Sequence, residues 1–213
     1  MSSCLTSRLP AAFAVALACA LPAGATTIDF SVLQTIPAAS SAHTYAGFDA
    51  SGTTLHVAQS AGASMNPLFG AWPGLWLGGS QDSDRYGFTF NKAVTFIEFY
   101  ITAQSTAIGL YSEVFNAFST NAPSTASFVN LVGTAWDGAN LTSSVEDGRS
   151  RIRFTSIGAA GFSSIAFDHL QTGAPYGSVI EEIQFSAVVP EPASYALMLA
   201  GLTLLGSLAR RRR

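Results

Sequence analysis

The chemically most suggestive segment of the chain runs from residue 66 to residue 79, where tryptophan, phenylalanine, proline and glycine are concentrated. Trp72 and Trp76 each offer a flat apolar face with a polar edge, which suits stacking against a sugar ring. A loop carrying both rings predicts a glycan-binding platform. The alternative is that both rings fill one end of a hydrophobic core. Trp136, beside Asp137, is assigned to the core.

Two further groups of charged residues have spacings that suit binding. Arg149, Arg151 and Arg153 alternate along a strand-like run and therefore share one face. This face can contact an acidic polysaccharide, or it can simply offset the acidic body of the chain. Asp82 and Asp84 have the alternate spacing of a calcium loop, but the other oxygen ligands cannot be named. We therefore assign no metal site.

No motif in the chain predicts catalysis. The three histidines lack a metal-ligand spacing: His43, His56 and His169. Asp168 precedes His169, but a catalytic triad depends on geometry that adjacency cannot supply. Glu181 and Glu182 should point to opposite faces of a strand and so cannot flank one glycosidic bond. We expect no enzyme activity and no cofactor, with a hydrolase of unrecognised site as the alternative.

The elements that must position these residues are short strands. Turn-forming residues separate runs in which apolar and polar side chains alternate, and no segment shows a helical period over a dozen residues. The clearest runs are Thr53–Gln59, Tyr86–Phe90, Val94–Ile101, Arg149–Phe154 and Val179–Ala187. Strands at this spacing predict an all-β fold, an antiparallel β-sandwich of jelly-roll type.

Charge and cysteine content exclude several classes of function. Only 11% of the residues are charged, against about 25% in an average soluble protein. Between Thr26 and Val189, five cations stand against twelve carboxylates, a formal net charge of −7. Such a body has no basic face for nucleic acid. The two cysteines, Cys4 and Cys19, lie in the N-terminal segment, so the rest of the chain has no disulfide and no thiolate chemistry.

The N-terminal residues 1–25 are typical of a secretory signal peptide. A single arginine precedes the apolar stretch Ala11–Leu21, and Ala23 and Ala25 are the small residues that signal peptidase reads. We expect cleavage after Ala25. The alternative is a buried helix of the mature fold. A lipoprotein signal at Cys19 is disfavoured, because alanine stands three residues earlier in place of a bulky aliphatic side chain.

The C-terminal residues 189–213 have three consecutive parts. The first is the motif Pro190, Glu191 and Pro192, and the second is the uncharged run Ala193–Ala209. As a helix this run spans roughly 25 Å, close to the thickness of a bilayer core. The third part is a cluster of four arginines: Arg210, Arg211, Arg212 and Arg213. These arginines should stay in the cytoplasm. A plain single-helix membrane anchor is the alternative interpretation.

This tripartite tail resembles the PEP-CTERM sorting signal, which the membrane protease exosortase reads. The resemblance implies a Gram-negative producer, an inner-membrane intermediate, removal of the tail near Pro190–Pro192, and delivery to a surface rich in exopolysaccharide. Thr27–Phe30 and Ile183–Ser186 also resemble the paired terminal strands of PEP-CTERM passenger domains. We therefore expect three parts: signal peptide 1–25, passenger domain 26–188 and sorting signal 189–213. The expected function is that of a non-catalytic envelope or matrix protein of a biofilm, with a carbohydrate-binding module as the alternative.

Overall fold

The structure is a computed structural model that describes residues 24–30, 42–48, 52–59, 66–69, 72–78, 84–104, 106–107, 111–172, 177–188 and 201. The chain divides into two compact units. One is Ala23–Val188, which contains all the strands described below. The other comprises Met1–Pro22 and Val189–Arg213, and Gly201 is its one described residue. The predicted signal helix and transmembrane helix lie outside the described residues.

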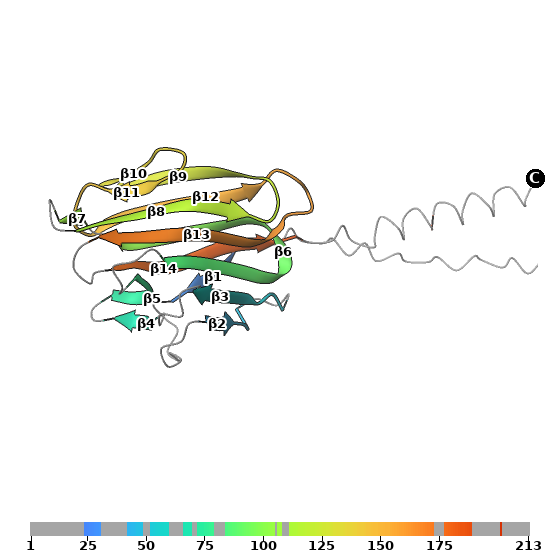
Figure 1. Ribbon diagram of the computed structural model, residues 1–213. Coiled ribbons are helices and arrows are strands. Elements are labelled where there is room, and N and C mark those ends of the chain that lie inside the picture. The colour runs from blue at the N-terminus through green and yellow to red at the C-terminus, as the bar shows by residue number, and fades with distance from the viewer. Residues whose placement is uncertain are drawn as a thin grey trace, which may run out of the picture. The chain divides into compact units, whose positions relative to one another are not determined.

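Fourteen strands occur among the described residues: β1 (Thr26–Asp29), β2 (Ala42–Tyr45), β3 (Leu55–Gln59), β4 (Asn66–Phe69), β5 (Trp72–Gly78), β6 (Asp84–Gln104), β7 (Thr106–Ala107), β8 (Tyr111–Thr120), β9 (Ser124–Val132), β10 (Thr134–Trp136), β11 (Leu141–Ser143), β12 (Gly148–Ser156), β13 (Phe162–Thr172) and β14 (Gly177–Ala187). The strands pair antiparallel throughout, in one sheet whose main path is β10-β11-β8-β13-β6-β14-β5-β4 (Figure 1). The predicted all-β, antiparallel class is therefore confirmed.

The sheet curls because its longest strand changes neighbours halfway along. The first half of β6 pairs with β3 and β13, and the second half pairs with β12 and β14. A register shift in the β13 ladder falls between Thr89 and Val94. The rings of Phe88 and Phe99, on the two halves of β6, lie only 5.0 Å apart. The strand therefore bends between them, and the sheet closes toward a half-barrel.

Aromatic side chains fill the inside of the curl. Phe167 on β13 is fully buried, and its ring centroid lies 5.2 to 5.7 Å from those of four other phenylalanines: Phe88, Phe99, Phe115 and Phe118. The inward rows follow the predicted alternation. Tyr86, Phe88 and Phe90 are buried, whereas Thr89 between them is exposed.

The first and last described strands of the body pair with each other. In β1 and β14, Thr26 opposes Phe185 and Ile28 opposes Ile183, and both isoleucines are buried. The predicted pairing of these terminal strands is confirmed. It fixes both ends of the described body in one ladder.

Candidate functional site

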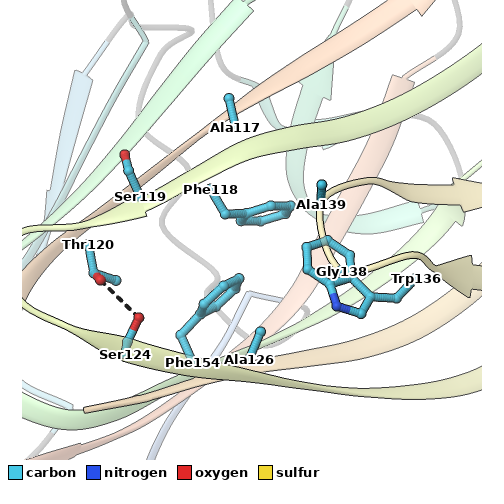
Figure 2. Close-up of a pocket in the computed structure, with 10 residues that line it drawn as sticks. All are labelled: Ala117, Phe118, Ser119, Thr120, Ser124, Ala126, Trp136, Gly138, Ala139 and Phe154. Carbon is cyan, nitrogen blue, oxygen red and sulfur yellow. Dashed lines mark hydrogen bonds between the residues drawn. The ribbon is translucent and has the colours of Figure 1, made fainter. Parts of the chain in front are cut away.

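An open pocket of about 360 Å³ lies between β8, the start of β9, β12 and the β10–β11 hairpin (Figure 2). The rings of Phe118, Trp136 and Phe154 form its apolar wall. We call this pocket the aromatic pocket. The Phe118 ring stacks on Phe154 at 5.0 Å and meets Trp136 edge-on at 5.5 Å. Phe154 is nearly fully buried, whereas Phe118 and Trp136 are half-buried.

A β-bulge in β8 turns Phe118 toward this pocket. Glu113 and Phe115 point inward, so strict alternation would point Ala117 inward and Phe118 outward. The β13 ladder shifts register here: Asn116 pairs with Asp168, but Ser119 pairs with Ala166. Two residues of β8 thus oppose the single Phe167, and Ala117 takes a positive φ of 50°. The extra residue reverses the faces and aims Phe118 and Thr120 at the pocket.

A short turn holds Trp136 in place. Trp136 pairs with Leu141 across the β10–β11 hairpin, and residues 137–140 join the two strands. Asp137 Oδ1 accepts hydrogen bonds from the backbone N–H groups of Ala139 and Asn140, and Oδ2 accepts one from Asn140 Nδ2. The hydrogen bonds from Asn140 and Ala139 hold the pKa of the Asp137 carboxyl below its ordinary value. The turn is therefore ordered by its own side chains before any ligand binds.

Hydroxyl groups supply the polar side of the pocket. Thr120 Oγ1 and Ser124 Oγ lie 2.9 Å apart, as the dashed line in Figure 2 shows, and Thr120 Oγ1 also donates to the carbonyl of Ala122. Ser119 accepts a hydrogen bond from Arg85. None of the described residues that line the pocket has a charged side chain. An apolar wall with a few fixed hydroxyls is suited to a small, neutral, polar ligand with an apolar face.

The predicted glycan platform lies on a strand instead of a loop. Trp72 and Trp76 both belong to β5, because Trp76 pairs with Val179 of β14 and extends that ladder. Trp76 is half-buried, and its ring lies so close to Gly177 that a side chain there would meet it. The side chain of Trp72 lies outside what the structure describes. Trp76 is not among the described residues that line the aromatic pocket.

Arg151 and Arg153 on β12 have acidic partners. Arg153 Nε lies 2.8 Å from Glu98, and Arg151 Nη1 lies 3.0 Å from Glu98 and 3.7 Å from Glu182. The guanidinium groups also cover the rings of Tyr100 and Phe96. The predicted shared face is confirmed, but its charge is largely neutralised within the sheet. An acidic polysaccharide would have to displace these carboxylates.

The residues considered for catalysis are separated. Asp168 binds Arg85 at 2.7 Å on the outer side of β13, whereas His169 points into the core. Glu181 accepts a hydrogen bond from Thr102. His43 and His56 lie on the neighbouring strands β2 and β3, where His56 Nδ1 contacts Thr44 at 2.9 Å. The described residues contain no group of three or more acidic, histidine or cysteine side chains arranged to hold a metal ion, and Asp82 lies outside them.

Sequence reasoning missed a second set of polar residues, which lies inside the curl. We call these the polar interior: Gln59, Glu113, His169, Gln171 and Ser178, all nearly fully buried. Ser178 Oγ on β14 donates to Glu113 Oε2 on β8 at 2.6 Å. Burial lowers the pKa of His169 to about 4. Within the described residues, His169 Nε2 and both polar atoms of the Gln59 side chain have no hydrogen-bond partner. Nothing in the sequence showed that these residues converge.

Comparison with known proteins gives a match at the C-terminus. Residues 188–213 fit the family model described as the PEP-CTERM protein-sorting motif. The chain carries a PEP-CTERM sorting motif. The residues predicted to form it, Pro190 to Pro192 and the terminal arginines, all lie within the matched range. The recognition made from the sequence is therefore confirmed.

The PEP-CTERM motif indicates a substrate of exosortase that is exported to the cell surface or beyond. It covers only the C-terminal tail and says nothing about the chemistry of the β body. No curated protein matches the chain. No solved structure matches it either. In the described part of the chain, no helix has the length and apolar character needed to cross a membrane. The predicted span Ala193–Ala209 lies outside that part, apart from Gly201.

Proposed function

We propose that this is a non-catalytic protein of the extracellular matrix whose β body binds a neutral glycan in the aromatic pocket. The observation that carries the proposal is the pocket itself, with three rings on one side and fixed hydroxyls on the other. Sugar rings have apolar C–H faces and hydroxyl edges, so they match this division of chemistry. The PEP-CTERM motif supplies the context, because matrices outside Gram-negative cells are rich in exopolysaccharide.

The size and charge of the pocket narrow the ligand class. A volume of about 360 Å³ lies at the small end of the range of ligand sites, so one or two sugar rings are the expected occupants. The described lining residues include no cation to pair with a uronic acid, and the carboxylate of Asp137, beside Trp136 and Gly138 in sequence, is already bound by its own turn. Neutral hexoses should therefore bind better than acidic sugars.

The route to the matrix follows from the two ends of the chain. Signal peptidase would remove residues 1–25, with Ala23 and Ala25 as its recognition residues. The run Ala193–Ala209 would hold the chain in the inner membrane, with the arginine cluster in the cytoplasm. Exosortase would then cut near Pro190–Pro192 and release the body to the cell surface, where it would take part in a biofilm.

The body is proposed to be a β-sandwich of jelly-roll type formed by the two halves of the curled sheet. Ring contacts between the halves support this assignment. Phe118 on β8 stacks on Phe154 of β12, and Phe90 on β6 lies 4.9 Å from Phe185 of β14. A non-catalytic role is supported by the binding of Asp168 to Arg85 and of Glu98 to two arginines, which leaves these carboxylates engaged in the sheet.

Intact-mass measurement on the protein purified from its producing strain tests the sorting half of the proposal. A surface or matrix fraction whose mass lacks residues 1–25 and the tail beyond Pro190–Pro192 is expected. A protein that keeps Arg210–Arg213 and stays in the inner membrane would show that the tail acts as a plain anchor. If the protein is recovered in the surface or matrix fraction but binds no glycan, only a structural role in the matrix remains.

A glycan array followed by calorimetry tests the binding half. We expect Trp136→Ala to weaken binding of neutral glycans by about tenfold or more, which corresponds to roughly 1.4 kcal/mol. Ala139→Tyr should also block the pocket by filling it, without removing a core contact. Trp76→Ala is the matched control. If Trp76→Ala abolishes binding and Trp136→Ala does not, the platform on β5 is the site; if no glycan binds at all, the proposal fails.

A further inference from the structure

Exposed apolar side chains are concentrated on one strand of the described body. The described residues contain four exposed large hydrophobic side chains, and three of them belong to β9: Val129 (53% exposed), Leu131 (44%) and Val132 (45%). The fourth, Ile157, lies in the turn after β12 and is 67% exposed. Single exposed apolar residues are common on protein surfaces, but a cluster on one element suggests contact with a partner.

The strand β9 also forms an edge of the described sheet, at the top of the body in Figure 1. Its residues pair with β12 from Ser124 to Val132, and no second described strand pairs with it. An edge strand presents alternate backbone N–H and C=O groups that can pair with another strand. Natural proteins usually protect such edges with charged residues or proline. The nine residues of β9 include neither.

We propose that β9 pairs antiparallel with β9 of a second copy of this chain, so that one continuous sheet crosses the two molecules. Such a contact is self-complementary, because a two-fold axis places the same strand on both sides. The three exposed apolar residues Val129, Leu131 and Val132 gather at one end of β9, where the ladder with β12 shifts register between Asn130 and Val132. The apolar side chains of the two copies would therefore meet around that end of the seam. The proposal depends on the edge alone and not on glycan binding.

Charge favours a second copy over a charged partner. The body between Thr26 and Val189 carries a formal net charge of −7, so two copies repel each other at most surfaces. The nine residues of β9 include no charged side chain, and on the adjacent β12 the guanidinium groups of Arg151 and Arg153 lie beside Glu98 and Glu182. Two acidic bodies can therefore approach at this edge with no charged side chain on either of the paired strands, and added salt should strengthen the contact.

Sedimentation velocity over a range of concentrations tests the contact in the protein purified from its producing strain. We expect a monomer–dimer equilibrium. The Val129→Lys, Leu131→Lys double variant should weaken dimerisation by about tenfold or more, because it sets like charges across the seam. Ile157→Lys is the matched control, since it adds charge at an exposed apolar residue away from β9, and it should leave the equilibrium nearly unchanged.

Cysteine cross-linking tests the same contact without depending on the stability of the lysine variant. With Cys4 and Cys19 replaced by serine, single cysteines at Ser127, Val129 or Leu131 can be introduced in a chain that has no other thiol. A disulfide requires Cα atoms within about 7 Å, so the position nearest the two-fold axis should give a covalent dimer on a non-reducing gel. Ile157→Cys should give none.

Four results would overturn the proposal. One is a protein that stays monomeric up to its solubility limit. Another is a dimer that persists in the lysine variant, which would place the interface on another surface. The third is a cross-link at Ile157 without one on β9. A cross-link from β9 to a different protein would also reject the second copy as the occupant.

Discussion

The aromatic pocket and the polar interior differ from each other, and each departs from the usual rule that apolar side chains are buried and polar side chains are exposed. In the aromatic pocket, large apolar rings are partly exposed to solvent, whereas in the polar interior, ionisable and amide side chains are nearly fully buried. The strand β8 contributes to both, with Glu113 in the polar interior and Phe118 in the pocket. Phe167 touches Phe118 on one side and Phe115 on the other, and Phe115 in turn contacts His169 at 4.7 Å.

Both arrangements have an energetic cost, and the two costs have different consequences. Exposed rings forgo about 25 cal/mol for each Å² of apolar surface left in water, and a ligand that covers them recovers this energy. Buried polar groups lose their hydration, and a folded protein can recover that only by internal hydrogen bonds such as Ser178 to Glu113. The pocket is therefore suited to binding. The polar interior instead makes stability depend on pH.

The largest effect is expected where the two regions meet. Phe167 is 0% exposed, and its ring contacts both Phe118 of the aromatic pocket and Phe115 beside the polar interior. Phe167→Ala would remove this ring and leave a buried cavity between the two regions. The free energy of unfolding should fall by about 3–5 kcal/mol in urea denaturation. The control Phe167→Leu keeps most of the volume and should cost much less. A loss below about 1 kcal/mol for the alanine variant would show that the two regions are packed independently.

The next prediction is that the stability of the protein depends on pH through His169 of the polar interior, whereas glycan binding in the aromatic pocket does not. Burial lowers the pKa of His169 from 6.5 to about 4 in the folded protein. As pH falls, the unfolded chain therefore binds a proton on this histidine before the folded chain does, and stability is lost between about pH 6.5 and pH 4. The loss amounts to at most about 3 kcal/mol, and glycan binding should not change in parallel. Urea denaturation at a series of pH values measures it.

The matched variant for this pH dependence is His169→Gln, which keeps a buried polar group that does not titrate. Asp84, the register partner of His169 on β6, and Glu113 on β8 are the same in both proteins. The difference between the two profiles isolates the histidine. Identical slopes in wild type and variant would mean that His169 gains a proton inside the fold as readily as in the unfolded chain.

The elements that were predicted from the sequence are those in which every second side chain is apolar. Tyr86, Phe88 and Phe90, and likewise Ile152 and Phe154, are buried as their alternation indicates. Arg151 and Arg153 share the opposite face. Alternation depends only on the pleat of a single strand, so one sequence is enough to reveal it. The pairing of β1 with β14 was also anticipated, from a resemblance to passenger domains.

The aromatic pocket was not predictable by the same reasoning. Its wall comes from four segments that only the strand pairing brings together: residues 117–120, Ser124 with Ala126, Trp136 with Gly138 and Ala139, and Phe154. Its central ring, Phe118, faces inward because of a one-residue bulge that breaks the alternation on which the prediction relied. Trp136 was assigned to the core, and it does pack against Phe118, but it remains half-buried at the pocket wall.

A smaller effect tests whether the polar interior is held together by its internal hydrogen bond. Ser178→Ala would remove the donor to Glu113 Oε2 and leave a buried carboxylate oxygen without it. Such a loss costs about 1–3 kcal/mol. Ser178→Thr keeps the hydroxyl and serves as the control. Equal stability of the alanine variant and wild type would mean that Glu113 is satisfied without Ser178, and the distinction between a closed polar interior and an open pocket would weaken.

The smallest effect concerns the bulge that creates the pocket, and it should be stabilising. Ala117 has a φ of 50°, a left-handed conformation that costs a residue with a Cβ about 1–2 kcal/mol. Ala117→Gly relieves this strain but adds about 0.5–1 kcal/mol of backbone entropy to be lost on folding. The strain is the larger quantity, so urea denaturation should show a net gain of roughly 0.5–1 kcal/mol.

Because the bulge keeps its extra residue in Ala117→Gly, Phe118 stays inward and glycan affinity should not fall. Asp147→Gly, at the other non-glycine positive φ among the described residues, is the matched control remote from the pocket lining. A variant that gained stability but lost glycan binding would show that Ala117 itself, and not only the bulge, shapes the pocket.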